Sequence, residues 1–136
     1  MNTMEEETSG LRKDVTRVFL LLLVTNLAAI AAGLLGTTRT LYLFVTIGGV
    51  AAFMSAVSYG RTKGAKDKKQ LGRAAMQGLW VNCSMALGYF LTAPAPYFSS
   101  PAIVWGVALV AGGVAIVASV YFLFRVHRTT GVPFSV

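Results

Sequence analysis

The sequence predicts an all-α integral membrane protein in which four transmembrane helices form two helical hairpins, with the N-terminus and the C-terminus both cytoplasmic. The first reason is composition: 55% of the residues are apolar and 12% are charged, whereas soluble domains carry about 25% charged residues. The second is four uncharged runs near the roughly 20 residues that a helix needs to cross a bilayer. The third is the placement of basic residues at alternate ends of those runs. A chain of 136 residues has room for one domain, 1–136.

The first two uncharged runs lie on either side of Arg39. The run before it predicts a helix over about 15–37, and the run after it predicts a helix over about 40–60. Because only a short turn separates them, the two helices should form a tight hairpin. We interpret residues 1–17, which pass from an acidic to a basic stretch, as a short approach along the membrane surface.

A polar segment over 61–72 follows, and we interpret it as a solvated, basic cytoplasmic loop. With the adjoining arginine it holds half of the twelve basic residues of the chain, namely Arg61, Lys63, Lys66, Lys68, Lys69 and Arg73. These six side chains are candidates for contact with anionic lipid or with an acidic partner, because juxtamembrane Lys and Arg are each attracted to an anionic surface by about 1 kcal/mol. The alternative is that they are merely the topology signal.

The third and fourth helices are predicted over about 73–93 and 101–126. Pro94 and Pro96 end the third helix, because proline lacks the amide hydrogen that a helix interior uses and restricts the residue before it. Ser100 followed by Pro101 is typical of a helix start, with an N-cap residue and proline at the first helical position.

The distribution of basic residues predicts the orientation, because Lys and Arg in short flanking segments are retained on the cytoplasmic side. Eleven of the twelve lie on the side of the termini and the middle loop, and only Arg39 lies opposite. We therefore expect a multi-pass protein of the cell (inner) membrane whose first partner is the lipid bilayer. The net charge of +7 does not indicate nucleic-acid binding, because the basic residues flank apolar runs and form no basic face interleaved with contact residues.

Small residues predict where the helices touch, because helices in lipid associate by close packing rather than by escape from water. They recur every four residues on the second helix and on the fourth, as Gly48, Ala52, Ala56 and Gly60 and as Ala111, Ala115 and Ser119. Two interpretations stay open. The stripes pack the bundle of this chain, or at least one of them contacts another chain.

Asn26 and Asn82 are the most informative polar residues within the uncharged runs. Each follows a basic residue, Arg17 or Arg73, by nine positions, so a rise of 1.5 Å per residue places both roughly 13 Å deep. We expect them to point at neighbouring helices at a common level, where one hydrogen bond contributes about 0.6 kcal/mol and at most about 2 kcal/mol. The alternative is a ligand or ion site formed by both amides with Thr25, Gln77 and Ser84.

The sequence predicts no catalytic residue, no cofactor and no metal site. The four runs that we expect to cross the membrane contain no Asp, Glu, Lys, Arg or His. Proton relays and ion-coupled transporters normally need such a side chain within the membrane. The chain has one His and one Cys, on different segments, whereas metal sites need clusters of ligands and nucleophilic sites need an adjacent base. We therefore expect that the protein is not an enzyme.

Three functional hypotheses follow. The favoured one is a non-catalytic structural or accessory subunit of a larger membrane complex, whose partners are other membrane protein subunits. The second is a small self-associating pore, holin-like or transport protein, which would use the asparagine and threonine faces. The third is an immunity-type or regulatory protein that blocks another membrane protein.

Overall fold

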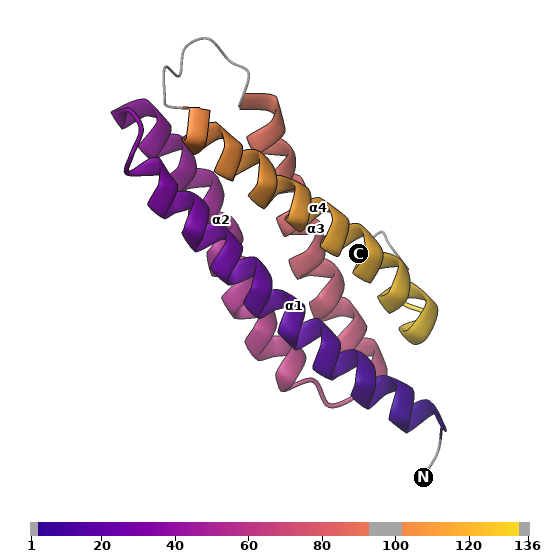
Figure 1. Cartoon of the computed structure of the whole chain (residues 1–136). Coiled ribbons are helices and arrows are strands. Elements are labelled where there is room, and N and C mark those ends of the chain that lie inside the picture. Colours follow the sequence, from indigo (N-terminus) through magenta and orange to yellow (C-terminus); the bar gives the residue numbers. More distant parts are fainter. Residues whose placement is uncertain (1–2, 93–101, 134–136) are drawn as a thin grey trace.

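The computed structural model describes residues 3–92 and 102–133, and it describes them as four helices. These are α1 (Thr3–Gly33), α2 (Thr38–Lys63), α3 (Lys68–Thr92) and α4 (Ala102–Thr130). Within these ranges no residue belongs to a strand, so the predicted all-helical class is confirmed. Figure 1 shows the helices as long rods lying side by side.

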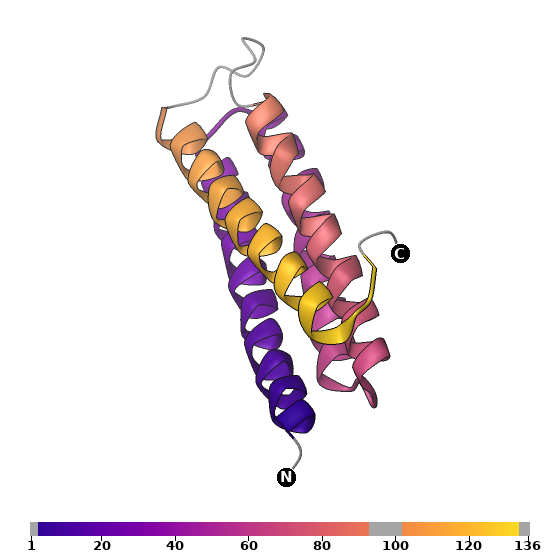
Figure 2. The ribbon, with the colours of Figure 1, turned by 90° about the vertical axis from the view of Figure 1, so that its right-hand side faces the viewer.

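Consecutive helices run antiparallel (Figure 1 and Figure 2). The contacts follow a ring in which α1 packs on α2 and α4, while α3 packs on the same two helices from the other side. α1 and α3 lie diagonally opposite each other in this ring and make only a few contacts. The start of α1 and the α2–α3 connection lie at one end of the bundle, which we call the basic end, and the α1–α2 connection lies at the other.

Three of the helices are long and apolar enough to cross a membrane: α1 from Thr8 to Gly33, α2 and α4. Together they indicate a membrane protein. The third predicted crossing, α3, is not among them. Its apolar stretch is interrupted by Gln77 and Asn82, and its first turns carry Lys68, Lys69 and Arg73.

α1 begins and ends earlier than the predicted range of 15–37. Its first half packs on the basic end instead of lying apart: the side chains of Leu11 and Val15 are buried, and the Arg12 guanidinium donates to the carbonyl of Ala65 at 2.6 Å. The helix ends at Gly33 because the next three amides bond carbonyls three residues back, which tightens the chain into a turn.

The basic loop is shorter than predicted, because α2 continues through Lys63 and α3 begins at Lys68. Residues 64–67 alone connect the two helices. Asp67 caps α3, since its carboxylate accepts from the amide of Gln70 at 2.7 Å, and the Gln70 side chain accepts from the amide of Lys66 at 3.0 Å. Together these bonds resemble a capping box. Charge alone indicated a loop here, but charged side chains at helix ends are equally well solvated.

α4 continues to Thr130, beyond the predicted end at 126. Gly131, with a φ of 73°, then reverses the chain, and Val132 is buried close to Gly72 at the start of α3. The predicted boundaries at 93 and 101, together with the prolines and the serine N-cap that motivate them, lie outside the described residues.

Candidate functional site

The centre of the bundle holds a polar cluster of four side chains, which are Asn26 of α1, Ser55 of α2, and Asn82 and Tyr89 of α3. All are at most 2% exposed. The Asn26 amide donates to the Asn82 side-chain oxygen at 3.3 Å, the Asn82 amide donates to Ser55 Oγ at 3.0 Å, and the Tyr89 hydroxyl donates to the Asn26 oxygen at 3.4 Å. The cluster therefore joins three helices.

Three of these side chains also bond their own helix one turn back. The Asn26 amide donates to the Leu22 carbonyl at 2.8 Å, the Asn82 amide to the Gly78 carbonyl at 2.9 Å, and Ser55 Oγ lies 2.7 Å from the Ala51 carbonyl. The cluster thus directs its hydrogens at protein atoms. A buried network whose members are satisfied makes a helix register specific.

Two glycines let the helices approach closely enough for the cluster to form. A Cβ at Gly48 would lie 2.8 Å from Ile30 Cγ1 and 2.9 Å from the Tyr89 hydroxyl. A Cβ at Gly78 would collide with Ser58 and lie 2.6 Å from Phe19 Cε1. The Gly48 contact joins α2 to α1 and α3, and the Gly78 contact joins α3 to α1 and α2.

The structure divides the small-residue stripe of α2. Gly48 and Ala52 are buried, whereas Ala56 and Gly60 are exposed. A spacing of four residues drifts by about 40° at each step around a helix of 3.6 residues per turn. The buried face of α2 instead combines steps of four with steps of three, and it passes through Thr40, Phe44, Gly48, Ala51, Ser55, Ser58 and Thr62.

The stripe on α4 faces the bundle of this chain: Ala111, Ala115 and Ser119 are all buried, next to Ala108 and Gly112. Gly112 marks the contact with α3, because a Cβ there would lie 3.2 Å from the Phe90 ring and 3.3 Å from the Ala86 carbonyl. These α4 residues are covered by the chain itself.

The residues of the alternative ligand site are not brought together. Asn26 and Asn82 meet in the interior, while Gln77 and Ser84 are exposed. Thr25 donates to the Leu21 carbonyl of its own helix at 2.7 Å.

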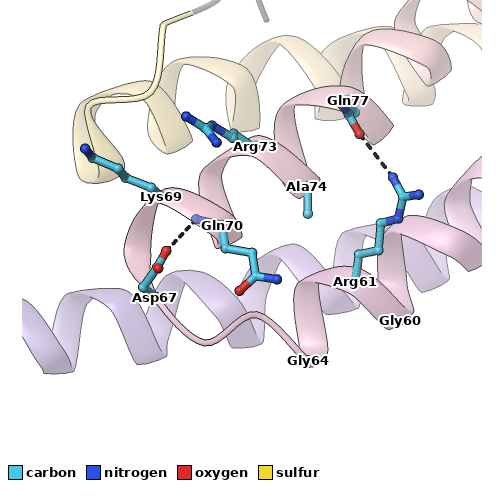
Figure 3. A pocket seen from close by; sticks show the side chains of 9 residues that line it. All are labelled: Gly60, Arg61, Gly64, Asp67, Lys69, Gln70, Arg73, Ala74 and Gln77. Atoms are coloured by element: carbon cyan, nitrogen blue, oxygen red, sulfur yellow. Dashed lines mark hydrogen bonds between the residues drawn. The ribbon is translucent and has the colours of Figure 1, made fainter.

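Three of the six basic residues, Arg61, Lys69 and Arg73, line an open hollow of roughly 710 Å³ between the end of α2 and the start of α3. We call it the α2–α3 hollow. The Arg61 guanidinium donates to the Gln77 side-chain oxygen at 3.2 Å, and Figure 3 shows this bond crossing from α2 to α3. The remaining lining residues are Gly60, Gly64, Asp67, Gln70, Ala74 and Gln77. Lys63, Lys66 and Lys68 do not line it.

Ion pairing ties α1 to α4 at the basic end, where Arg125 lies 2.7 Å from the Asp14 carboxylate. Both side chains are about one third exposed, so water weakens the attraction.

The described residues include no group of three or more His, Cys, Asp or Glu side chains placed to hold a metal ion.

Sequence reasoning missed Ser55 and Tyr89. Both carried a signal, since Ser55 follows Gly48 by seven residues and Tyr89 follows Asn82 by seven. Seven residues are about two helical turns, so each lies on the same face as its partner.

The fold and the cluster together define a helical-bundle membrane protein whose central polar groups bond each other. Comparison of the chain with models of known protein families, with curated proteins and with solved structures found no match.

Proposed function

We propose that this chain is a non-catalytic, multi-pass protein of the cell (inner) membrane that acts as a structural or accessory subunit of a larger membrane complex. In the proposed topology α3 is a fourth crossing, the helices form two hairpins, and the basic end with both termini is cytoplasmic. The packing of α3 on both α2 and α4 supports its crossing. The eleven basic residues on that side of the predicted topology support the orientation.

The observation that carries the proposal is a set of glycines that the packing of this chain does not require. Gly106 and Gly113 lie on α4, and a Cβ added at either would meet nothing within 4 Å. The neighbouring Gly112 differs, because it is needed against α3. Small residues let helices approach each other closely in lipid. The outer face of α4 therefore suits contact with a helix of another membrane protein.

This outer face is also hollowed at Gly113. The depression holds roughly 460 Å³ and is lined by Gly113, Val114, Val117, Ala118 and Tyr121. Val117 and Tyr121 are more than half exposed. A partner helix could pack into the depression at the glycine and against the apolar side chains that surround it. Van der Waals packing of this kind drives helix association in membranes.

Purification from native membranes in a mild detergent, with quantitative mass spectrometry of what is retained, tests the proposal. Gly113→Leu adds bulk at the groove and should lower the yield of the partner subunit at least about tenfold, a change worth about 1.4 kcal/mol. Gly49→Leu is the matched control, because a Cβ at Gly49 also meets nothing within 4 Å, but this residue lies on α2. The control should retain the partner.

Two outcomes would contradict the proposal. If Gly49→Leu removes the partner as strongly as Gly113→Leu does, then the outer face of α4 is not the contact. If the unmodified chain is a monomer in native membranes and shows transport or turnover without a partner, then it is not an accessory subunit. Retention of a second copy of this chain alone would favour the self-associating alternative.

A further inference from the structure

We propose that the α2–α3 hollow binds the phosphate headgroup of an anionic phospholipid through Lys69 and Arg73 of α3, whose charged groups point to the same side in Figure 3. This inference goes beyond the proposed function, because it assigns a ligand class to a site that subunit assembly does not require. It also separates two of the six basic residues from the other four.

The charge balance of the hollow favours a phosphate. Three cationic side chains line it against the single carboxylate of Asp67. That carboxylate already accepts from the Gln70 amide at 2.7 Å, as Figure 3 shows. An excess of two positive charges remains. Lys69 and Arg73 are four residues apart, so they lie on one face of α3, where their like charges repel unless an anion is present.

The hollow is open because small residues form part of its lining. A Cβ at Gly60 would meet nothing within 4 Å, and Gly64 and Ala74 add little bulk. The volume of roughly 710 Å³ falls within the range of about 300–1,000 Å³ that small-ligand sites occupy. The Arg61 guanidinium is bonded to Gln77, on the other side of Ala74 from the charged groups of Lys69 and Arg73 (Figure 3).

The position of the hollow favours a lipid over a soluble anion. One turn deeper on α2 lies the exposed Ala56, and on α3 the exposed face continues from Gln77 through Trp80, Ser84 and Leu87. Trp80 is 43% exposed and Leu87 is 50% exposed. In the proposed topology this strip faces the acyl chains. A phospholipid bound at the hollow can lay a chain along it.

Trp80 gives the experiment its reporter. With Trp105→Phe as background, Trp80 is the remaining tryptophan of the chain. The full-length protein is placed in vesicles of phosphatidylcholine that contain either brominated phosphatidylglycerol or brominated phosphatidylcholine at the same mole fraction. Bromine quenches tryptophan at short range, so occupation of the hollow appears as stronger quenching by the anionic lipid. The inference rests on the crossing by α3 in the proposed topology, but no partner protein is present, so the result is independent of assembly with other subunits.

Charge-matched variants separate a site from general attraction. Arg73→Gln and Lys69→Gln should each lower the apparent affinity for phosphatidylglycerol about fivefold, the effect of about 1 kcal/mol per basic residue. Lys63→Gln and Lys66→Gln remove the same charge at the same end of the bundle but outside the hollow. Each should change the apparent affinity for phosphatidylglycerol less than about twofold. Unchanged quenching by brominated phosphatidylcholine shows that Trp80 keeps its contact with the acyl chains in a variant, and two hollow variants guard against the failure of one.

The proposal is overturned if all four variants lose affinity equally, because the attraction is then diffuse. It is overturned as well if brominated phosphatidylglycerol quenches the fluorescence of Trp80 no more than brominated phosphatidylcholine does. A third arm adds inorganic phosphate against sodium chloride at the same ionic strength. If phosphate alone abolishes the preference, the ligand is a soluble phosphate and the assignment to a lipid fails.

Discussion

At the scale of residues, Asn82 is the point on which three helices converge. Its side-chain oxygen accepts from Asn26 at 3.3 Å and its amide donates to Ser55 at 3.0 Å. Each interhelical bond contributes little in a membrane, about 0.6 kcal/mol on average. The effect of the cluster therefore depends on several bonds sharing one residue.

We expect Asn82→Leu to lower the free energy of unfolding by about 1–2 kcal/mol, because Asn26 and Ser55 each lose a partner. Ser84→Leu is the control, since Ser84 is an exposed polar residue on the same helix and should lose less than about 0.5 kcal/mol. Unfolding in mixed micelles with increasing dodecyl sulfate measures both. Equal losses would show that Asn82 makes no special contribution.

The glycines give a second prediction at this scale. Gly78→Ala places a methyl group against Ser58 and Phe19 and should cost about 1–3 kcal/mol through overpacking. Gly106→Ala meets nothing within 4 Å and should stabilise the helix by up to about 1 kcal/mol. The same unfolding assay should give changes of opposite sign, and two changes of the same sign would contradict the packing described here.

At the scale of helices, the first half of α1 packs on the bundle mainly through the buried apolar side chains of Leu11 and Val15. Leu11 is 1% exposed and Val15 is fully buried, whereas the Asp14–Arg125 pair is partly solvated. Burial of one large apolar side chain outweighs a surface ion pair.

Leu11→Ala should therefore cost about 2–5 kcal/mol, and Asp14→Asn less than about 1 kcal/mol. Protease cleavage near residue 10, followed in detergent, reports the release of this segment and should rise sharply for the first variant only. A greater effect of Asp14→Asn would mean that the ion pair holds the helix.

The sequence specified the helices better than it specified their ends. Four uncharged runs gave four helices, because backbone hydrogen bonding in an apolar solvent leaves few alternatives. The equal offsets of Asn26 and Asn82 predicted a common depth, and a regular helix preserves such offsets. The start of α1 was missed because its packing at the basic end depends on tertiary contacts of Leu11 and Arg12. The α2–α3 hollow was missed for the same reason, since it forms only when two helix ends meet.

At the scale of the whole molecule, the contacts at the basic end join segments far apart in the sequence. Arg12 bonds the carbonyl of Ala65, Asp14 pairs with Arg125, and Val132 lies against Gly72. These contacts place the described ends of the chain and the α2–α3 connection at the same end. In the proposed topology that end is cytoplasmic.

Labelling of single cysteines in a Cys83→Ser background tests this topology and the crossing by α3. Lys66→Cys and Pro133→Cys should react from the same side of the membrane, and Thr38→Cys from the other, with an impermeant maleimide on intact and opened cells. If position 133 is instead labelled from the same side as position 38, then positions 66 and 133 lie on opposite sides of the membrane. In that case only α4 crosses between them, and α3 does not.

The polar cluster has a consequence for the order of synthesis. A ribosome delivers α1 and α2 before α3, so Asn26 and Ser55 enter the bilayer before Asn82 and Tyr89 exist to bond them. The early hairpin thus presents an amide and a hydroxyl on its inner side, and these can receive the next helix. In the proposed topology, α3 does not have to be as apolar as the other helices, because Asn82 and Tyr89 can form hydrogen bonds with side chains of α1 and α2 that are already in the membrane.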